Sequence, residues 1–413
     1  MGRARDGLRA LFPAVVVRRF WLPLFALMGV GELGARLLDA SPCEAIVPDA
    51  RGWDSMIGDS RYLWKLEPNR RFESPNAVTQ TNAVGLRTSL LPEDPKGAGE
   101  LRVVVTGDST IFGWGVPDGE TYAELLELEL DRAISDRRVR VINLGVPGYS
   151  TEQTLLLLED LGWSYQPDLL VVHNLFSDSN IDAFQDRDAL RLANPENSPV
   201  YRSLHRSRLY CAAYMPLARF QAQYQQESDR VLMPGRPPDA DDALALESVD
   251  ALIDLSRVPL DDYVENLERM AQQATEHGAQ MVLAPLAQEW DVGLWRHPGV
   301  EPPGPTDLLP WQPHREAARR VADDRGLAFV DVPEAFAQAP GEPALLFIDQ
   351  MHPSAWGAQV LARAVADAVR ERPDLLGLEG GIPPAAPLSP PATGGPNPAP
   401  DQLPPREGEP PGG

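Results

Sequence analysis

The sequence predicts an α/β protein in which a central parallel sheet lies between two layers of helices. Between Leu101 and Arg370, short runs of β-branched and aliphatic residues alternate with longer stretches of helical periodicity. This alternation is typical of parallel sheets with crossover helices. Glycines that end two of the helical stretches, Gly278 and Gly326, stand two residues before the next predicted strand and mark the return to the sheet.

The expected elements follow in chain order. Strands are predicted at residues 102–106, 138–144, 168–173, 280–285 and 328–330, and helices at 121–133, 150–162, 261–277, 313–325 and 354–370. Because crossover helices bring the carboxyl ends of parallel strands to one edge, a site is expected there. Two stretches break the alternation and predict insertions near that edge, as a lid or a side layer: residues 182–259 and 288–312.

Composition divides the chain further into four parts. Residues 1–40 predict a hydrophobic anchor or signal segment, and 41–100 an irregular N-terminal layer rich in loops. Residues 101–372 hold the predicted α/β domain. The stretch 373–413 contains 13 prolines and 8 glycines in 41 residues, so a disordered tail is expected there.

The N-terminus differs in charge from the rest of the chain. Residues 1–36 carry six arginines and two acidic residues, around two apolar runs, Ala10–Val17 and Phe20–Gly31. The second run has 12 residues, fewer than the roughly 20 needed to cross the hydrocarbon core. Basic residues before it and an acid after it favour an uncleaved anchor with its N-terminus inside. The alternative is an amphipathic helix packed on the domain.

Charge and cysteine content exclude several classes of protein. With 37 basic and 60 acidic side chains the net charge is −23, which argues against nucleic acid as a partner. Two cysteines, Cys43 and Cys211, cannot build a disulfide framework or a thiolate metal cage. One bridge between them is possible, and two separate buried thiols are favoured. No cluster of metal ligands is visible, so neither a metal nor another cofactor is expected.

A serine directly after the first predicted strand is the candidate nucleophile. The triplet Gly-Asp-Ser occurs at 58–60 and at 107–109, and the second copy follows the buried strand at the expected site edge. A nucleophilic serine needs exposure and neighbouring backbone N–H groups that can hold an oxyanion. Ser109 has that context, whereas Ser60 has no strand before it. The plainer alternative for Ser109 is a residue that caps a turn.

A histidine and an aspartate three residues apart supply the candidate base. In Asp349-Gln350-Met351-His352, a tight turn lets the carboxylate accept from Nδ1 and leaves Nε2 free for a serine. His277 has the position of a helix C-cap, and His173 lies at a strand end near the same edge. The remaining histidines lie in or beside the insertions: His205, His297 and His314.

These blocks resemble the SGNH/GDSL hydrolase superfamily over about residues 101–370. The nucleophile block matches 104–110, the glycine block matches 143–148 with Gly145, and the Asp-x-x-His block matches 349–352. Residues 81–87 and the Glu-Leu-x-x-Arg-Leu-Leu pattern of 32–38 are similar to a membrane-anchored bacterial branch. The resemblance implies the flavodoxin-like, three-layer SGNH hydrolase fold preceded by an N-terminal hydrophobic helix.

One block departs from the family pattern of Gly-x-Asn-Asp after the third strand. The glycine position is Leu175 and the asparagine position, whose side chain donates to the oxyanion, is Ser177. A serine hydroxyl can donate one hydrogen bond, and Asn174 and Asn180 are amides that could substitute. The resemblance thus implies an oxyanion site formed by the N–H groups of Ser109 and Gly145 with the Ser177 side chain.

The resemblance implies a serine esterase that acts through an acyl-enzyme, with Ser109, His352 and Asp349 as its catalytic residues. An acylated carbohydrate or envelope lipid is the expected substrate, and the expected location is membrane-anchored and extracytoplasmic. Two alternatives stay open: an O-acyltransferase with the same chemistry, and a non-catalytic glycan-binding or scaffold module on the same fold.

Overall fold

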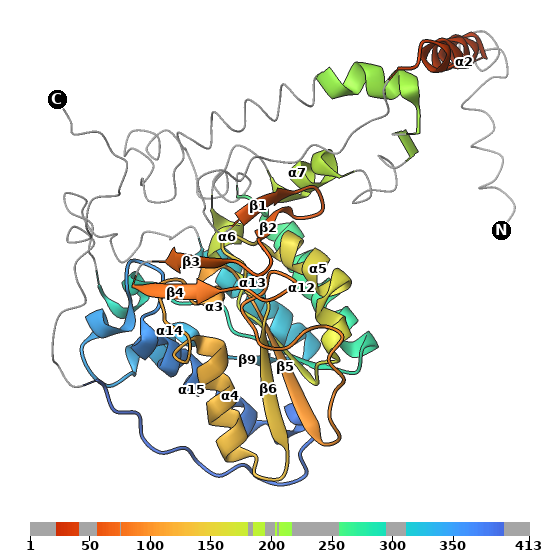
Figure 1. Cartoon of the computed structure of the whole chain (residues 1–413). Helices are drawn as coiled ribbons and strands as arrows, with labels where there is room; N and C mark the ends of the chain where they lie inside the picture. Colours follow the sequence, from red (N-terminus) through yellow and green to blue (C-terminus); the bar gives the residue numbers. More distant parts are fainter. Residues whose placement is uncertain are drawn as a thin grey trace, which may run out of the picture. The chain divides into compact units, whose positions relative to one another are not determined.

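The computed structural model describes residues 22–40, 56–74, 76–180, 185–194, 203–204, 206–216, 256–294 and 311–391 (Figure 1). Contacts divide the chain into two compact units. The smaller unit comprises Met1–Asp49, Gly58–Trp64 and Asp188–Arg236, and the larger unit contains the remaining residues and the central sheet.

The central sheet confirms the predicted parallel arrangement. Its strand order is β6-β5-β7-β8-β9, and all four neighbouring pairs are parallel. The strands are β5 Glu100–Thr106, β6 Arg138–Asn143, β7 Leu169–Val172, β8 Gln280–Leu283 and β9 Ala328–Phe329. Numbered from β5, this is the order 2-1-3-4-5 of doubly wound flavodoxin-like sheets, whose switch point lies between β5 and β7.

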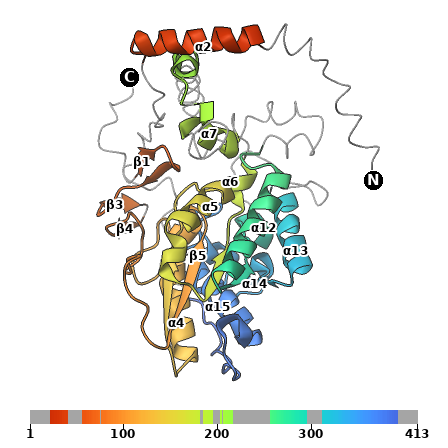
Figure 2. The same cartoon turned by 90° about the vertical axis from the view of Figure 1, so that its right-hand side faces the viewer.

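Long helices cover both faces of this sheet (Figure 1, Figure 2). Helices α4 (Tyr122–Ala133) and α15 (Ala355–Glu371) pack together on one face, where Val103 and Val105 share a core with Leu126 and Leu361. The other face carries α5 (Thr151–Asp160), α12 (Leu260–Glu276) and α13 (Gln312–Arg325). The short helices are α3 Ser109–Phe112, α6 Phe176–Ser179, α7 Asp186–Ala193, α14 Val332–Ala337, η2 Gly162–Tyr165, η4 Glu289–Val292, η5 Pro343–Leu346 and η6 Pro373–Leu376.

The N-terminal layer is more regular than its sequence indicates. Two two-stranded sheets occupy part of it, β1 (Met56–Asp59) with β2 (Leu63–Leu66), and β3 (Arg71–Ser74) with antiparallel β4 (Ala77–Gln80). Each strand has four residues, which is too short for alternation to stand out from the surrounding polar sequence. Ser60 lies in the turn after β1, where Asp59 Oδ1 accepts the N–H groups of Arg61 and Tyr62.

The predicted tail begins too early at residue 373. Residues 373–376 form η6, and Leu375 and Leu376 are buried in the main core beside α15. The high average proline and glycine content of this stretch concealed an apolar pair that packs like any core residue. Residues 392–413 of the predicted tail lie outside the described residues.

Helix α2 (Leu22–Leu37) belongs to the smaller unit and falls within the predicted anchor. Glu32 on this helix accepts hydrogen bonds from the Leu209 N–H, the Ser207 hydroxyl and the Arg208 N–H, at 2.7–3.1 Å. These bonds lower the pKa of Glu32 to about 2. Several apolar side chains of α2 and the residue after it are exposed: Leu27, Met28, Val30, Leu33, Leu37 and Leu38. Among the described residues, no helix is both long and apolar enough to span a bilayer.

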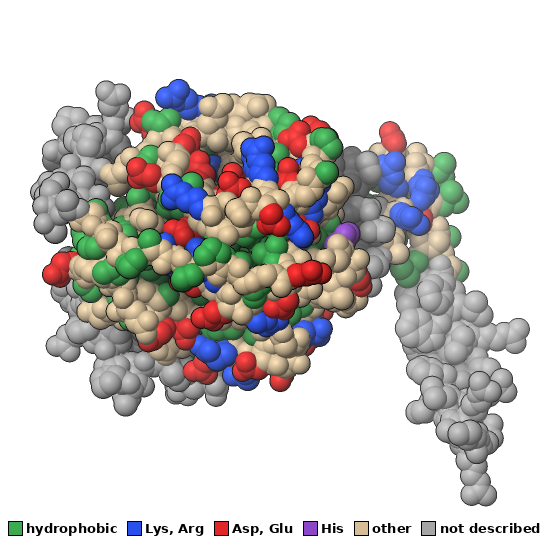
Figure 3. All heavy atoms as spheres, turned by 90° about the horizontal axis from the view of Figure 1, so that it is seen from below, with side chains coloured by type: hydrophobic (Ala, Val, Ile, Leu, Met, Phe, Trp, Pro, Cys, Tyr) green, Lys and Arg blue, Asp and Glu red, His purple; other side chains and the backbone are tan. Residues whose placement is uncertain are grey.

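Acidic and basic side chains are interspersed on the face seen in Figure 3. Many of the arginines in the described part of the chain pair with carboxylates. Glu129 on α4, for example, accepts from both Arg363 and Arg370 on α15, at 2.8 and 3.2 Å. These pairs tie the two helices of one face together.

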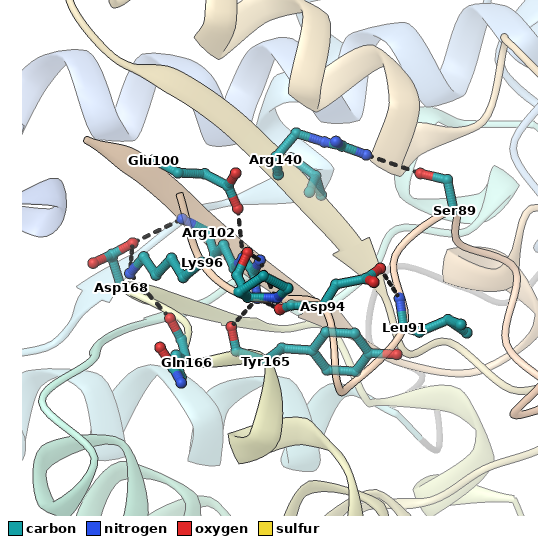
Figure 4. A network of polar contacts seen from close by, with 12 residues as sticks. Ser89, Leu91, Asp94, Lys96, Glu100, Arg102, Arg140, Tyr165, Gln166 and Asp168 are labelled. Carbon is teal, nitrogen blue, oxygen red and sulfur yellow. Dashed lines mark hydrogen bonds and ion pairs between the residues drawn. The ribbon is translucent and has the colours of Figure 1, made fainter. Parts of the chain in front are cut away.

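A buried arginine secures the opposite end of the sheet from the predicted site (Figure 4). Arg102 on β5 is 1% exposed, pairs with Glu100 at 2.6 Å and donates to the carbonyls of Asp94, Pro95 and Tyr165. Asp168 at the start of β7 accepts the Arg102 N–H at 2.7 Å and the Lys96 ammonium at 2.6 Å. The network joins residues 94–96, which precede the sheet, to β5 and β7, the two strands on either side of the switch point.

We expect Arg102→Ala to lower the free energy of unfolding by about 3 kcal/mol, because it leaves Glu100 and the carbonyls of Asp94, Pro95 and Tyr165 without their buried donor. Denaturant unfolding followed by circular dichroism measures the change. Arg269→Ala is the control, since Arg269 forms an exposed pair with Glu159 and should change stability by less than about 1 kcal/mol. Equal effects of the two variants would contradict this account of the network.

Candidate active site

Ser109 leaves the sheet at the carboxyl end of β5, beside the switch point. It is the first residue of α3, and Asp108 before it caps this helix by accepting the Thr110 N–H at 3.0 Å. The Ser109 carbonyl accepts from the N–H groups of Gly113 and Trp114 at 3.1 and 3.0 Å. The serine is therefore held in a tight turn between a buried strand and a single helical turn.

The structure brings Ser109 together with the two residues predicted from the Asp-x-x-His spacing. The Ser109 hydroxyl donates to His352 Nε2 at 2.8 Å, and His352 Nδ1 donates to Asp349 Oδ2 at 2.7 Å. All three belong to the larger unit. This is the geometry that a serine nucleophile, a general base and an orienting carboxylate require.

Local backbone hydrogen bonds explain how Asp349 and His352, which are three residues apart, come into contact with each other. The Ile348 N–H donates to the His352 carbonyl at 2.8 Å, and Phe347 forms an antiparallel bridge with Pro353. Inside this closed loop Asp349 Oδ1 accepts the N–H groups of Met351 and His352 at 3.0 and 2.9 Å. Burial raises the pKa of Asp349, but the bonds and charge of His352 and the Met351 N–H outweigh it and lower the pKa to about 2.

Gly145 lies against the helix that begins with Ser109. A Cβ atom at this position would stand 2.4 Å from the Phe112 nitrogen, so any larger residue would displace α3. The Gly145 N–H donates to Asn143 Oδ1 at 2.8 Å, and Asn143 Nδ2 donates to the Ile111 carbonyl at 2.7 Å. In this state the Gly145 N–H, predicted as an oxyanion donor, is engaged by Asn143, a residue that sequence reasoning did not single out.

Ser177 lies on α6, which follows β7 across the switch point from Ser109. Its hydroxyl donates to Asp108 Oδ2 at 3.2 Å, so its single proton is directed at the residue before the nucleophile. Hydroxyl donors to carboxylates usually approach to about 2.5–2.7 Å, so this bond is weak and the hydroxyl can rotate to another acceptor. By contrast, the Ser109 backbone N–H donates to no acceptor in the described part of the chain.

The two alternative amides have different surroundings. Asn174 is buried, and its Nδ2 donates to Thr154 Oγ1 at 3.0 Å and to the Tyr149 carbonyl at 3.3 Å. Asn180 is exposed at the C-terminal end of α6, where its carbonyl accepts the Arg257 N–H. The Asn174 amide is thus committed to the core, whereas Asn180 has an exposed side chain.

The other described histidines serve the core or the surface. His173 is buried between the Ala284 carbonyl and the Tyr122 hydroxyl, and burial lowers its pKa to about 3. His314 is buried with Nε2 at 2.9 Å from the Val258 carbonyl. His277 ends α12 and stacks on Trp163. His205 and His297 lie outside the described residues.

We expect the free energy of unfolding to depend on pH, because Asp178, the residue after Ser177, carries a buried carboxyl group. Burial raises the pKa of Asp178 to about 7, although the Thr151 N–H and hydroxyl bind its Oδ1 and oppose the shift. Because this pKa lies above the ordinary value of 3.8, the contribution of Asp178 to stability is present at low pH and is lost as pH rises through about 7. In Asp178→Asn this loss should be absent.

Measured between pH 5 and pH 8, the free energy of unfolding of the wild type should fall relative to Asp178→Asn by on the order of 2 kcal/mol. The asparagine keeps an oxygen for Thr151, so the hydrogen bonds are matched. Parallel pH profiles of the two proteins would show that Asp178 is not a buried group with a raised pKa.

Comparison with known proteins gives matches at the level of structure. No family model and no curated protein matches the sequence. The solved structures similar to this chain include an alpha/beta hydrolase enzyme from the metagenome of Lake Arreo, at 18% identity and a TM-score of 0.40, covering 67% of this chain and 97% of that one. An acetylxylan esterase from Geobacillus stearothermophilus matches at 16% identity and a TM-score of 0.39, covering 66% and 95% of the two chains.

A lipase/acylhydrolase from Enterococcus faecalis also matches at 16% identity and a TM-score of 0.39, covering 66% of this chain and 96% of that one. Likenesses at these identities and TM-scores do not transfer an activity to this chain. It is therefore the geometry of Ser109, His352 and Asp349 that supports a function.

Proposed function

We propose that this protein is a serine-dependent ester hydrolase that works through an acyl-enzyme. The observation that carries the proposal is the continuous hydrogen-bonded chain from the Ser109 hydroxyl through His352 to Asp349, with distances of 2.8 and 2.7 Å. His352 accepts from the serine on one nitrogen and donates to the carboxylate on the other. That arrangement fixes the tautomer in which Nε2 can take a proton.

The residues then have defined tasks. Ser109 Oγ attacks the ester carbonyl while its proton passes to His352 Nε2, and Asp349 stabilises the imidazolium that forms. His352 returns the proton to the leaving alcohol as the tetrahedral intermediate collapses to the acyl-enzyme. Water attacks the acyl group in the second half, with His352 again taking and returning a proton. The free N–H of Ser109 is the first donor to the oxyanion, and a rotated Ser177 hydroxyl is the second.

Ester hydrolysis by the purified full chain tests this proposal. A panel of p-nitrophenyl esters from acetate to octanoate, with a peracetylated sugar beside them, reports both turnover and the preferred acyl length. A folded protein that turns over none of these esters at neutral pH would argue against a hydrolase. Adding a free sugar as acceptor separates the alternatives, since an O-acyltransferase forms the sugar ester at the expense of free acid.

A non-catalytic module is the second candidate, and the engaged oxyanion donors favour it. The Gly145 N–H and the Ser177 hydroxyl both have partners, so the described structure leaves Ser109 as the one predicted backbone donor without an acceptor. Loss of one oxyanion donor costs a rate factor of about 10²–10³. Under this alternative a glycan would bind with equal affinity to the wild type and to Ser109→Ala, and no ester would be cleaved.

We propose an acylated carbohydrate or lipid of the cell envelope as the substrate, and a membrane-attached, extracytoplasmic location in a bacterium. The resemblance of residues 32–38 and 81–87 to an anchored branch supports both. The exposed apolar side chains of α2 offer a surface that could enter the lipid interface.

The state of Cys211 supports the proposed location. Cys211 is buried and disulfide-bonded, so the favoured expectation of two separate thiols is wrong. Disulfides persist in oxidising compartments and are rare in the bacterial cytosol. Cys43, the other cysteine of the sequence, lies outside the described residues.

We expect peptide mapping without reduction to find one Cys43–Cys211 disulfide in protein purified from the periplasm of an expression host. The expectation rests on the bonded state of Cys211 and on the presence of just one further cysteine. Mapping after reduction is the control, because it should release the two peptides separately. Two alkylated free thiols in the native protein would contradict both the bridge and the support it gives to the location.

A further inference from the structure

We infer that Arg87 is a positioning residue for the nucleophile, and that residues 82–87 form a brace for the turn that carries Ser109; this inference rests on the proposed function. The segment lies 22 residues before Ser109 in the sequence, counted from Arg87, and has no part in the proton-transfer chain. The contacts of Arg87 converge on Phe112, the last residue of α3, and on the residues that follow it. Sequence reasoning singled out this segment as part of a resemblance, without a role.

The loop of the brace holds its own shape. Asn82 Oδ1 accepts the N–H groups of Val84 and Leu86 at 3.0 and 2.9 Å, and Asn82 Nδ2 donates to the carbonyls of Thr88 and Leu90. Gly85 has a φ of +81°, and a Cβ there would stand 2.5 Å from the Leu66 carbonyl oxygen. The loop thus presents the next residues from a fixed backbone.

The guanidinium of Arg87 is fully used by the turn after α3. Nη1 donates to the carbonyls of Phe112 and Gly113 at 3.1 and 2.7 Å, and Nη2 donates to the Val116 carbonyl at 2.8 Å. Nε and Nη2 both donate to Asp118 Oδ1, at 3.1 and 2.6 Å. These five bonds match the five N–H donors of an arginine, and lysine has three.

Burial and ring contacts make this a rigid contact. The Arg87 side chain is 5% exposed, and its Cζ lies 5.4 Å from the centre of the Phe112 ring. Phe112 in turn stacks on Phe72 of β3, with ring centres 5.9 Å apart. Ser74 Oγ on the same strand accepts the Gly115 N–H at 3.3 Å. The hairpin of β3 and β4 and the Asn82–Arg87 loop therefore support the same turn.

A single helical turn cannot fix its own position, because one hydrogen bond does not offset the ordering of its residues. Helix α3 has four residues, and Ser109 is the first of them. Asp108 sets one end of this turn, and the carbonyls held by Arg87 set the other. Since Gly145 lies against Phe112 as well, a shift of this turn would move the serine and the neighbouring glycine loop together.

The test compares Arg87→Lys with Arg102→Lys in the full chain. Arg102 is also a buried arginine on backbone carbonyls, but it lies at the other end of the sheet. We expect Arg87→Lys to lower kcat by about 10-fold to 100-fold with KM within about twofold, as a displaced nucleophile would. The rate of fluorophosphonate labelling at Ser109 should fall by the same factor. Arg102→Lys should lower the unfolding midpoint and leave kcat and the labelling rate of the folded protein unchanged.

Asp118→Ala keeps the test decisive if Arg87→Lys does not fold. Asp118 is 59% exposed and accepts two of the five bonds, so its loss should leave the fold intact and lower kcat a few-fold. A kcat and labelling rate in folded Arg87→Lys or Asp118→Ala equal to the wild type, or a change in KM alone, would overturn the inference. A wild type that neither cleaves esters nor labels would instead overturn the proposed function.

Discussion

Ser109→Ala should abolish ester hydrolysis, lowering kcat by a factor of about 10⁶, with residual turnover from the remaining groups of the site. The Ser109 hydroxyl is the atom that His352 Nε2 contacts at 2.8 Å, and alanine offers no oxygen to attack the carbonyl. The side chain makes no other described hydrogen bond, so the fold should be unchanged. Steady-state hydrolysis of a p-nitrophenyl ester measures the loss.

Ser60→Ala is the matched control for this prediction. It alters the same Gly-Asp-Ser triplet at the turn after β1, where Asp59 serves the local backbone. Its kcat should equal that of the wild type. Ester hydrolysis that persists in Ser109→Ala at more than about a thousandth of the wild-type rate would assign the nucleophile elsewhere.

Asp349→Asn should lower kcat by a factor of about 10⁴. The asparagine amide can donate to His352 Nδ1, which would place the ring proton on Nε2, where it blocks acceptance from Ser109. The asparagine side chain has nearly the same size and shape as the aspartate side chain. Its oxygen can still accept the N–H groups of Met351 and His352. A kcat measured across pH 5 to 9 gives the size of the effect.

The pKa of Asp349 determines how this profile should look. With a pKa lowered to about 2 from the ordinary 3.8, the carboxylate stays ionised throughout the measured range. Its contribution to stability is present above pH 3.8 and is lost as pH falls through about 2. The deficit of Asp349→Asn should thus persist from pH 5 to 9. A deficit that vanishes at pH 5 would mean that Asp349 is already protonated there in the wild type.

The long periodic elements could be predicted from sequence because burial of one helical face repeats over several turns. Helix α12 was expected at 261–277 and is Leu260–Glu276, and α13 was expected at 313–325 and is Gln312–Arg325. Strand β5 was expected from Arg102 and begins at Glu100. The ends differ by one or two residues, since capping groups and not periodicity set them. The four-residue strands β1 to β4 carry no such repeated signal.

For the candidate site, sequence reasoning identified side chains that chemistry alone makes conspicuous. A serine after a buried strand and an Asp-x-x-His spacing point to Ser109, Asp349 and His352, and the structure brings the three into contact. The surrounding hydrogen bonds could not be read in the same way. That Asn143 engages Gly145 and Asp108 engages Ser177 depends on packing between elements far apart in the chain.

The role of Arg87 is a second feature that could not be predicted from the sequence. Its motif was visible in the sequence, but its task depends on the carbonyl groups of Phe112, Gly113 and Val116, which any residues could supply. Backbone acceptors leave no trace in residue type. The sequence offered one signal for a fixed loop there, namely an asparagine, Asn82, followed three residues later by a glycine, Gly85.

Covalent labelling of the full chain with a fluorophosphonate, followed by peptide mapping, is the decisive test of Ser109 as the nucleophile. The reagent phosphonylates a serine whose hydroxyl is activated by a neighbouring base. We expect one modified residue, Ser109, with labelling lost in Ser109→Ala and strongly slowed in Asp349→Asn. A folded wild type that stays unlabelled at neutral pH, or that is labelled at another serine, would contradict it.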